Sequence, residues 1–544
     1  MINSNNNTAK KINKPPIFAT VGVMMSITLT GKIMGILRDR MQSVYYGTYS
    51  MEAIAFEQAS FLPRVFLDIM FASIFSASFI PVFNRYLETK GKEAAFQLAA
   101  SFIKFLLLVT IAVTALCIIF AVPIYNLFLG GQYLAPETRD LGVLLLRMMF
   151  PIMVISSLAF SLTGILQSLG KFNIPAAMSV ASNGIILLYY FFFIDYFGVY
   201  GLAVAFLLGW SAQVLIQIPF LVKQQFFTSA NFKVSFKDSK AMREIGQLTL
   251  PVMVASWLGP VNFLVNGRAS ITLYGGEHGF VALNRAHVLY TVITGLFVLS
   301  LANVLFPTLS KLAAHKDWKE YAVFLRTSLR GLLFLLLPIT FGLMAVAEPL
   351  VRLVFQGGRF QDTSVEITAT ALFFFSLGIV GFGLQIILSR ACFALQDGKG
   401  PLITSVLAMV INFILSFALA PSMEIGGPAM ASSIAISLAA VGLLMRLRQK
   451  LPETLWTWRM TIDTSKMLIL ALAMYIAVRY GLGILDTRFI ENSLAARVLM
   501  VCIPVGLGAG IYMIGAFILR IPEAKFAAEW ALSKLNNSGK LKGV

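Results

Sequence analysis

The stretch that decides the fold is residues 105–122, FLLLVTIAVTALCIIFAV, which contains no charged side chain. A helix of about 20 apolar residues is long enough to cross the hydrocarbon core of a bilayer. A surface helix of a soluble protein would need a polar face, and this stretch has none. Similar apolar runs fill most of the chain on both sides of it. These runs predict a polytopic membrane protein.

The composition of the whole chain supports this prediction. Of its 544 residues 58% are hydrophobic and only 12% are charged, and the mean hydropathy is +0.81. An ordinary soluble domain has about 25% charged residues. The three cysteines and three histidines are scattered, so they offer neither a disulfide framework nor a zinc site. We therefore exclude a soluble enzyme, a disordered chain and a secreted disulfide scaffold, and we expect no metal and no cofactor.

The net charge of +18 does not indicate nucleic-acid binding. A nucleic-acid interface needs Lys and Arg clustered on a polar face, whereas here they lie in short connectors between apolar runs. Basic connectors, such as residues 223–243, alternate with acidic or mixed ones, such as residues 137–140. Under the positive-inside rule the basic connectors face the cytoplasm. The alternation predicts that both termini are cytoplasmic.

The apolar runs of roughly 17–30 residues predict an all-α polytopic fold with about fourteen transmembrane helices. The predicted spans are residues 17–37, 53–83, 95–129, 141–168, 175–197, 199–223, 246–274, 280–310, 320–355, 365–396, 401–420, 425–446, 464–485 and 493–520. Several runs exceed about 25 residues, which indicates tilt or projection beyond the bilayer.

An internal repeat relates the two halves of the chain. The matching segments are Leu127–Tyr133 with Val354–Phe360, Pro175 with Pro401, and Gly201 with Gly427, at offsets of 227, 226 and 226 residues. Each half holds six predicted spans, so both halves begin on the same side of the membrane, and the repeat is parallel. The predicted parts are a cytoplasmic tail (1–16), an N-lobe (17–225), a C-lobe (226–455), two additional helices (456–522) and a second cytoplasmic tail (523–544).

Ionisable side chains within the apolar runs are costly and usually face a polar cavity or a partner. Those that we select are Lys32 in the first span with Arg38 and Asp39 at its end, Arg64 and Asp68 in the second, Arg268 late in the seventh and Arg285 early in the eighth. We expect Asp68 to be the only carboxylate well inside a span. A cationic lining with few acids suits an anionic ligand, and phosphate or pyrophosphate is the obvious biological one.

A plainer interpretation stays open for each of these residues. Arg38, Arg268 and Arg285 also lie where interfacial anchors occur, so they need not touch a ligand. Arg64 and Asp68 lie one helical turn apart and could be an ion pair within one helix. Alternatively, Asp68 forms a gate with Arg38 or Lys32.

Several motifs, taken in order, resemble the MurJ (MviN) family of lipid II flippases in the multidrug/oligosaccharidyl-lipid/polysaccharide (MOP) exporter superfamily. The motifs are Gly31–Asp39 followed by Tyr45-Tyr46-Gly47, Phe75–Val82, Phe150-Pro151, the turn Gly170–Pro175 with Asn183, Asn284-Arg285, Leu305–Lys311 and Phe355–Phe360. The resemblance runs from about residue 20 to residue 450 and more weakly to residue 520. Fourteen helices is the count in this family, whereas the drug-exporting MATE relatives have twelve.

The resemblance implies a V-shaped, two-lobed transporter with a central cationic cavity. In that family, basic residues on helices 1, 2 and 8 engage the lipid-linked diphosphate, and helices 13 and 14 form a groove for the lipid tail. Carried onto this chain, the helix 1 residues are Lys32, where the family usually has Arg, Arg38 and Asp39. The helix 8 residue is Arg285.

Helix 2 departs from the family pattern. A basic pair is usual where this chain has Leu67-Asp68, and the acid that follows it in the family is replaced by Ala72-Ser73. The cation is instead Arg64, one turn earlier. Some relatives bind sodium through carboxylates in the C-lobe, but the matching region here holds Asn412 and Ser416. We therefore predict no sodium site and leave a coupling ion or the membrane potential open as the energy source.

The sequence and the resemblance together predict a transporter rather than an enzyme. The leading hypothesis is a flippase that carries a lipid-linked peptidoglycan precursor from the inner to the outer leaflet of the bacterial inner membrane by alternating access. We expect it to be a monomer. Its expected partners are the lipid-linked diphosphate sugar and membrane lipids. The alternatives are a flippase for another polyprenyl-diphosphate oligosaccharide and, further away, a cation-coupled drug exporter. A membrane glycosyltransferase ranks last, because it would need catalytic carboxylates and a larger extramembrane domain.

Overall fold

The computed structural model describes residues 17–66, 78–228, 231, 239–274, 276–486, 493–525 and 529. Within these residues the chain is helical, with no β-strand and one isolated bridge between Gly357 and Phe360. The prediction of an all-α polytopic fold is confirmed. Asp68 lies outside the described residues, as do both predicted tails for the most part.

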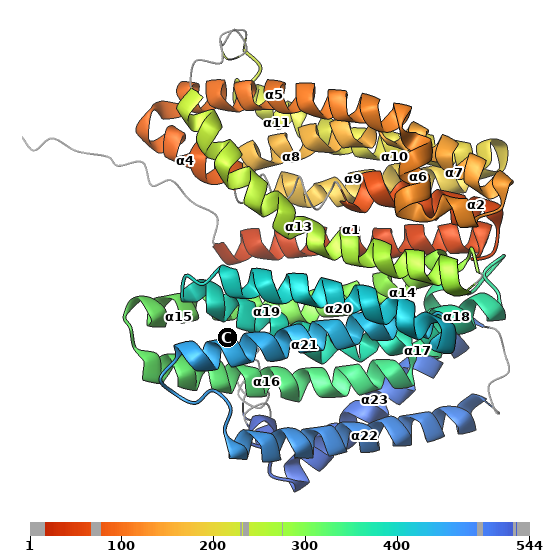
Figure 1. Cartoon of the computed structure of the whole chain (residues 1–544), viewed down its shortest axis with the longest axis vertical. Helices are drawn as coiled ribbons and strands as arrows, with labels where there is room; N and C mark the ends of the chain where they lie inside the picture. The colour runs from red at the N-terminus through yellow and green to blue at the C-terminus, as the bar shows by residue number, and fades with distance from the viewer. Residues whose placement is uncertain are drawn as a thin grey trace, which may run out of the picture. The chain divides into compact units, whose positions relative to one another are not determined.

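Within the described residues, each predicted span coincides with one helix or with an interrupted run of helices (Figure 1). The N-terminal helices are α1 (Ile17–Tyr46), α2 (Met51–Phe61), η1 (Leu62–Phe66), α4 (Ile80–Thr89), α5 (Gly91–Ile119), α6 (Ala121–Leu129), η3 (Gly131–Tyr133), α7 (Pro136–Met149), α8 (Ile152–Ser168), α9 (Asn173–Phe192), α10 (Ile194–Leu215) and α11 (Ile218–Lys223). The later helices are α13 (Ser239–Tyr274), α14 (Gly279–Thr294), η4 (Gly295–Leu299), α15 (Ser300–Ala314), α16 (Trp318–Ala345), α17 (Ala347–Phe355), α18 (Asp362–Ser376), α19 (Gly378–Ala394), α20 (Lys399–Met423), α21 (Gly426–Lys450), α22 (Trp458–Asp486) and α23 (Leu494–Ile518).

Ten helical spans among the described residues are long and apolar enough to cross a bilayer. The pair α18 and α19, bent by 42° at its break, would make an eleventh. The chain is therefore a multi-pass membrane protein. The count of fourteen and the boundaries of the two lobes stay predictions.

Several of the long predicted runs are interrupted rather than continuous. One run is divided at Phe120 into α5 and α6, another at Phe150-Pro151 into α7 and α8, and a third at Val346 into α16 and α17. Pro151 explains the second break, because proline has no backbone N–H and cannot continue a helical hydrogen-bond ladder. The length of an apolar run therefore overstates the length of its helices.

Apolar side chains on α5 point outward rather than into a core. Leu108 and Ile119 are each 67% exposed, and Ile111 and Leu116 are each 54% exposed. Water would make such a surface unstable, whereas lipid tails are as apolar as these side chains. The outer face of α5 is thus suited to contact with lipid.

The contacts between residues divide the chain into two compact units. Unit 1 comprises Met1–Arg38, Leu67–Ile119 and Met148–Met253. Its core is formed where α4, α5 and α8 pack together, with side chains from α9, α10, α11 and the start of α13. Phe79 anchors this core, because its ring stacks on that of Phe102 with centroids 5.1 Å apart and also contacts Phe83.

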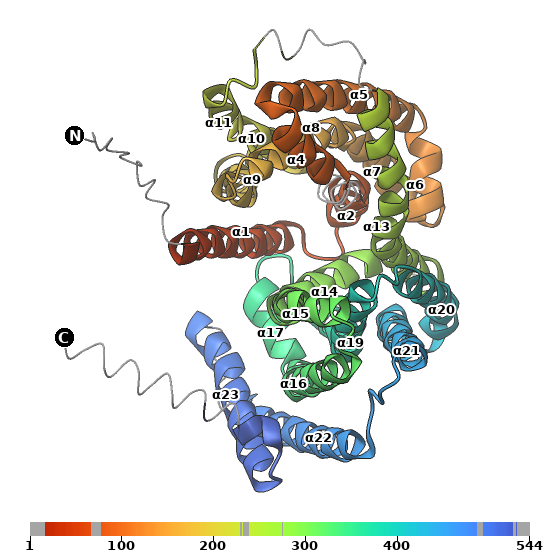
Figure 2. The same ribbon diagram turned by 90° about the vertical axis from the view of Figure 1, so that its left-hand side faces the viewer.

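Unit 2 comprises Asp39–Phe66, Phe120–Arg147 and Val254–Val544. Within it α19 packs against both α16 and α21, and α20 lies along α21. The two additional helices belong to this unit: α22 packs against α16, and α23 packs against α22 and α17 (Figure 2). This unit contains most of the charged residues described below.

Two of the family motifs meet at the end of α1, within unit 2. The backbone N–H of Arg359 donates to the carbonyl of Val44 at 2.9 Å. Gly358 has a φ of +51°, and a Cβ at this position would lie 2.3 Å from the carbonyl oxygen of Val44. Only glycine fits such a close approach in a left-handed conformation. The Gly-Gly pair of the 355–360 motif is thus explained by its packing on α1.

Candidate functional site

The most strongly buried charged group of unit 2 surrounds Glu57. Glu57 lies in the middle of α2, where every residue from Ala53 to Phe61 is buried, and its side chain is 0% exposed. The helix begins at a regular cap, since the hydroxyl of Ser50 accepts a hydrogen bond from the backbone N–H of Ala53. The carboxylate is therefore held inside the protein on a short, well-anchored helix.

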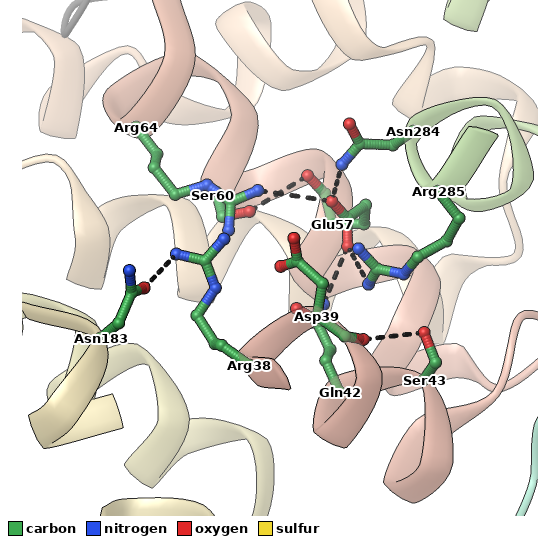
Figure 3. A network of polar contacts seen from close by, with 10 residues as sticks. All are labelled: Arg38, Asp39, Gln42, Ser43, Glu57, Ser60, Arg64, Asn183, Asn284 and Arg285. Carbon is green, nitrogen blue, oxygen red and sulfur yellow. Dashed lines mark hydrogen bonds and ion pairs between the residues drawn. The ribbon is translucent and has the colours of Figure 1, made fainter. Parts of the chain in front are cut away.

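Four side chains donate to this carboxylate (Figure 3). Arg285 Nη2 and Gln42 Nε2 each lie 2.8 Å from Oε2. Arg64 Nη2 lies 3.4 Å from Oε1, and Asn284 Nδ2 donates to the same oxygen. A buried carboxylate is tolerated only when it is paired and hydrogen-bonded in this way.

An aromatic cluster positions α2 against α13 and α14. The ring of Phe61 stacks on Phe263 with centroids 5.2 Å apart and meets Phe280 edge-on at 5.6 Å. Phe263 and Phe280 also contact each other at 5.8 Å. Since Asn284 and Arg285 follow Phe280 by about one turn of α14, this packing brings both side chains to Glu57.

Arg285 uses only part of its hydrogen-bonding capacity. Its side chain is 1% exposed, and Nη2 makes the ion pair with Glu57. Its Nε and Nη1 atoms are buried and have no hydrogen-bond acceptor among the described residues. A guanidinium binds a carboxylate or phosphate most strongly through two parallel N–H bonds, so the single contact to Glu57 is not the best that Arg285 can make.

Arg38 belongs to unit 1, where it contacts α9 and α10. Its Nη1 donates to Asn183 Oδ1 at 2.9 Å, and its guanidinium carbon lies 5.6 Å from the centre of the Phe206 ring. Asn183 in turn donates to the carbonyl of Gly31 at 3.2 Å. A Cβ on Gly31 would lie 3.0 Å from Ser179, so α1 and α9 are closely packed here. The small residue Gly31 thus lets α1 pack closely on α9 one to two turns before Arg38.

The other predicted site residues lie in different surroundings. Lys32 is exposed on α1, and Asp39 is buried at 3% exposure beside Gln42 (Figure 3). Arg268, in unit 2, donates to the carbonyl of Leu127 at the C-terminal end of α6. The structure thus brings together Arg64 and Arg285, while Arg268 contacts the end of α6.

Glu57 was missed by sequence reasoning; its carboxylate is fully buried, whereas Asp68, the carboxylate that we selected, lies outside the described residues. Glu57 lies within predicted span 53–83, seven residues before Arg64. At 100° per residue this spacing puts both side chains on one face of a helix. That spacing was the signal available in the sequence. The pairing with Arg285, 228 residues away, had no local signal.

Unit 2 also contains a neutral polar network around Asn266. Asn412 Nδ2 and Ser416 Oγ donate to Asn266 Oδ1 at 2.8 and 2.9 Å. The amide of Asn266 donates to Ser432 Oγ at 2.6 Å. Asn412 and Ser416 are the residues found where some family members have sodium-binding carboxylates. Here their polar atoms bind one another.

Three comparisons with known proteins bear on the family. The family model described as "Lipid II flippase MurJ" matches residues 45–500. A probable lipid II flippase MurJ of Buchnera aphidicola subsp. Schizaphis graminum is 30% identical over 437 residues, covering 79% of this chain and 82% of the relative. A probable lipid II flippase MurJ of Rhizobium tropici is 26% identical, covering 92% of this chain and 93% of the relative.

Solved structures show the same fold. A lipid II flippase MurJ in an inward closed conformation is similar with a TM-score of 0.75 at 23% identity, covering 91% of this chain and 98% of that one. An inward-facing MATE transporter of the MOP superfamily has a TM-score of 0.67 at 18% identity and covers 79% of this chain. With a family match over most of its length, and with the fold of that family, this chain belongs to the MurJ lipid II flippases.

Proposed function

We propose that this protein moves lipid II, an undecaprenyl-diphosphate sugar, from the inner to the outer leaflet of the bacterial cytoplasmic membrane. Membership of the MurJ family is the observation that carries this proposal. The chemistry of Arg285 supports it, because a buried guanidinium with unused N–H donors suits a diphosphate. We further propose that the chain works by alternating access as a transporter, without a cofactor or a chemical step.

Arg38, Arg64 and Arg285 are the cations that we propose bind the diphosphate, with Lys32 and Arg268 as further contributors. Each arginine already makes a hydrogen bond or ion pair within its own unit. A phosphate oxygen can replace such a partner, because charge-assisted bonds to phosphate are among the strongest in proteins. In the structure Glu57 is the acid that Arg64 and Arg285 contact, and we propose Asp39 and Asp68 as further gate or ion-pair acids.

The lipid tail needs an apolar surface, and unit 2 offers one. An apolar cavity of about 660 Å³ is lined by α16, α19 and α21 and by Trp456, two residues before α22. We propose that α22 and α23 help to guide the tail towards this face. The protein would act as a monomer with both termini in the cytoplasm.

Depletion of the protein tests the cargo. The lipid-linked precursor that accumulates on the cytoplasmic side should be lipid II, and the cells should lose their shape and lyse. Accumulation of a different polyprenyl-diphosphate oligosaccharide, with normal lipid II turnover, would favour the related alternative cargo. The departure of helix 2 from the family pattern makes this comparison worthwhile.

Substitution of the cations tests the binding site. Arg38→Ala or Arg285→Ala should each abolish complementation of the depleted strain while the protein still accumulates in the membrane. Loss of one charge-assisted contact costs about 1.5–3 kcal/mol, which is roughly ten- to a hundred-fold in affinity. Full complementation by Arg38→Ala would show that Arg38 is not needed for substrate binding and would favour its interpretation as an interfacial anchor.

A further inference from the structure

Glu57 is a weak partner of Arg285, and a stronger ligand could replace it. The ion pair is made through one guanidinium nitrogen, Nη2, at 2.8 Å. The remaining buried donors of Arg285, Nε and Nη1, have no acceptor within the described part of the chain. An anion with more oxygen atoms than a carboxylate could bind Nε and Nη1 as well as Nη2. Glu57 therefore uses one of the buried donor atoms of Arg285 and leaves two without an acceptor.

Within unit 2, the charges of the group around Glu57 balance without a ligand. The charged residues that unit 2 contributes are two cations, Arg64 and Arg285, and two buried acids, Glu57 and Asp39. An added anion would therefore bring excess negative charge into a buried site, which is costly. It can enter only if its contacts with the arginines exceed those that an acid gives up. Glu57 is the acid that contacts both arginines.

We infer that Glu57 is a specificity-determining residue. It stays paired with Arg285 in the presence of single-phosphate lipids, and a lipid-linked diphosphate displaces it from Arg285. This inference rests on the proposed function. A phosphodiester headgroup carries one negative charge, the same as Glu57. Replacing Glu57 by such a headgroup as the partner of Arg285 therefore gains little binding free energy and leaves a buried carboxylate without its cation. A diphosphate diester carries two negative charges and more acceptor oxygens, so it can engage Arg285 through the guanidinium fork and Arg64 in addition.

Such discrimination has a physical purpose in a membrane. Phosphodiester lipids make up the bilayer itself, so an unpaired Arg285 would be occupied by them almost all the time. A carboxylate fixed by Gln42 and Asn284 as well as by the arginines is always present at the site. It therefore competes with bulk lipid regardless of lipid concentration.

The test compares two ligands that differ in one phosphate. Polyprenyl-diphosphate and polyprenyl-monophosphate sugars, with the same prenyl chain and the same sugar, are titrated into the full-length protein in nanodiscs. The wild-type protein should prefer the diphosphate by at least about ten-fold. Glu57→Gln, which keeps the size and one acceptor oxygen, should bind the monophosphate ligand about ten- to a hundred-fold more tightly, so that the preference narrows.

Glu244→Gln is the matched control. Glu244 lies in unit 1, where it makes an exposed ion pair with Arg85, so its loss should leave both affinities unchanged. If Glu57→Gln does not fold, Glu57→Asp can be tested instead. Its side chain is one methylene shorter, so its carboxylate lies further from Arg285, and the preference for the diphosphate over the monophosphate ligand should again become smaller.

The outcomes separate the two proposals. A wild-type protein that binds the diphosphate ligand, with a preference that Glu57→Gln leaves unchanged, overturns the role of Glu57 and leaves the flippase proposal intact. A wild-type protein that binds neither ligand overturns the proposed function and the inference with it. A preference that narrows in Glu57→Gln and not in Glu244→Gln supports both.

Discussion

At the scale of single residues, Glu57 combines a structural role with the proposed role in selectivity. Removing its carboxylate in Glu57→Ala leaves Arg285 buried without a counter-charge. Breaking a buried ion pair in this way costs about 3–5 kcal/mol. We expect the free energy of unfolding, measured in detergent with a denaturant, to fall by that amount. A loss as small as that of the exposed Glu244→Ala would mean that water reaches Arg285.

Asp397 is the residue from which a pH effect is expected, and it lies in the turn between α19 and α20, outside both helices. Arg446 Nε and Lys450 Nζ lie 2.6 and 2.8 Å from its Oδ2. The hydrogen bond from Arg446 holds the pKa of the Asp397 carboxyl well below its usual range, assisted by Lys450 and the backbone N–H of Gly400.

Because the pKa is lower in the folded than in the unfolded protein, this group stabilises the fold above the unfolded pKa of about 4. The stabilisation is lost as the pH falls from there through the folded pKa. Asp397→Asn should therefore lower the midpoint of thermal unfolding at pH 7. The difference between the variant and the wild type should shrink as the pH falls below about 4. A difference that is the same at pH 7 and at pH 3 would contradict this account.

The candidate site could be predicted from the sequence only in part, for a reason that these residues make plain. Charged residues in apolar runs stand out because burial of charge is costly, so Arg64 and Arg285 are both visible in the sequence, and the structure places both beside Glu57. What the sequence lacks is a signal for pairs that are distant along the chain. Glu57 and Arg285 are brought together by the packing of Phe61, Phe263 and Phe280, and no periodicity encodes that.

At the scale of elements, the apolar runs predicted where the helices lie but not where they break. Hydrophobic length is set by the bilayer, so each run is visible in the sequence. A break costs only a few backbone hydrogen bonds and leaves the composition unchanged. Pro151 marks one break, and Pro123 and Pro349 lie four residues after Ile119 and Ala345, the last residues of α5 and α16, to whose carbonyls they cannot donate. Proline is an ambiguous signal, because Pro307 and Pro338 lie inside continuous helices.

The contact between the end of α1 and the loop 355–360 gives a prediction at this scale. In Gly358→Ala the new Cβ would meet the carbonyl oxygen of Val44 at 2.3 Å, in addition to the strain of a φ of +51°. Gly170, in the turn after α8, also has a positive φ of +73°, but a Cβ there meets nothing within 4 Å. Gly170→Ala should therefore cost about 1 kcal/mol and Gly358→Ala clearly more, by up to about 3 kcal/mol.

Thermal unfolding of both variants in the same detergent checks this difference. The comparison isolates the steric contact, because the backbone strain from φ is shared. Equal losses in the two variants would show that the loop moves away from α1 at little cost. A greater loss in Gly358→Ala would establish the contact with Val44 as a fixed part of unit 2.

At the scale of the whole molecule, the open quantity is the number of membrane crossings. Among the described residues, ten helical spans are long and apolar enough to cross a membrane, and the bent pair α18–α19 makes an eleventh. The fourteen predicted spans also include α1, the run that contains α2 and α4, and α13. These three carry charged residues such as Lys32, Arg64 and Arg268. In a transporter, charged spans of this kind are expected to line the substrate path.

Reporter fusions decide whether those charged helices cross the membrane. With fourteen spans and a cytoplasmic N-terminus, fusions after residues 235 and 455 should report the cytoplasm, and fusions near residues 276 and 488 the outside. The reason is parity: each crossing reverses the side, so omission of one helix inverts every later connector. The basic residues around 223–243 and 446–459 would then face outward, against the positive-inside rule. An outside signal at residue 235 together with an inside signal at residue 276 would remove an odd number of crossings from the first six spans, and with it the parallel repeat.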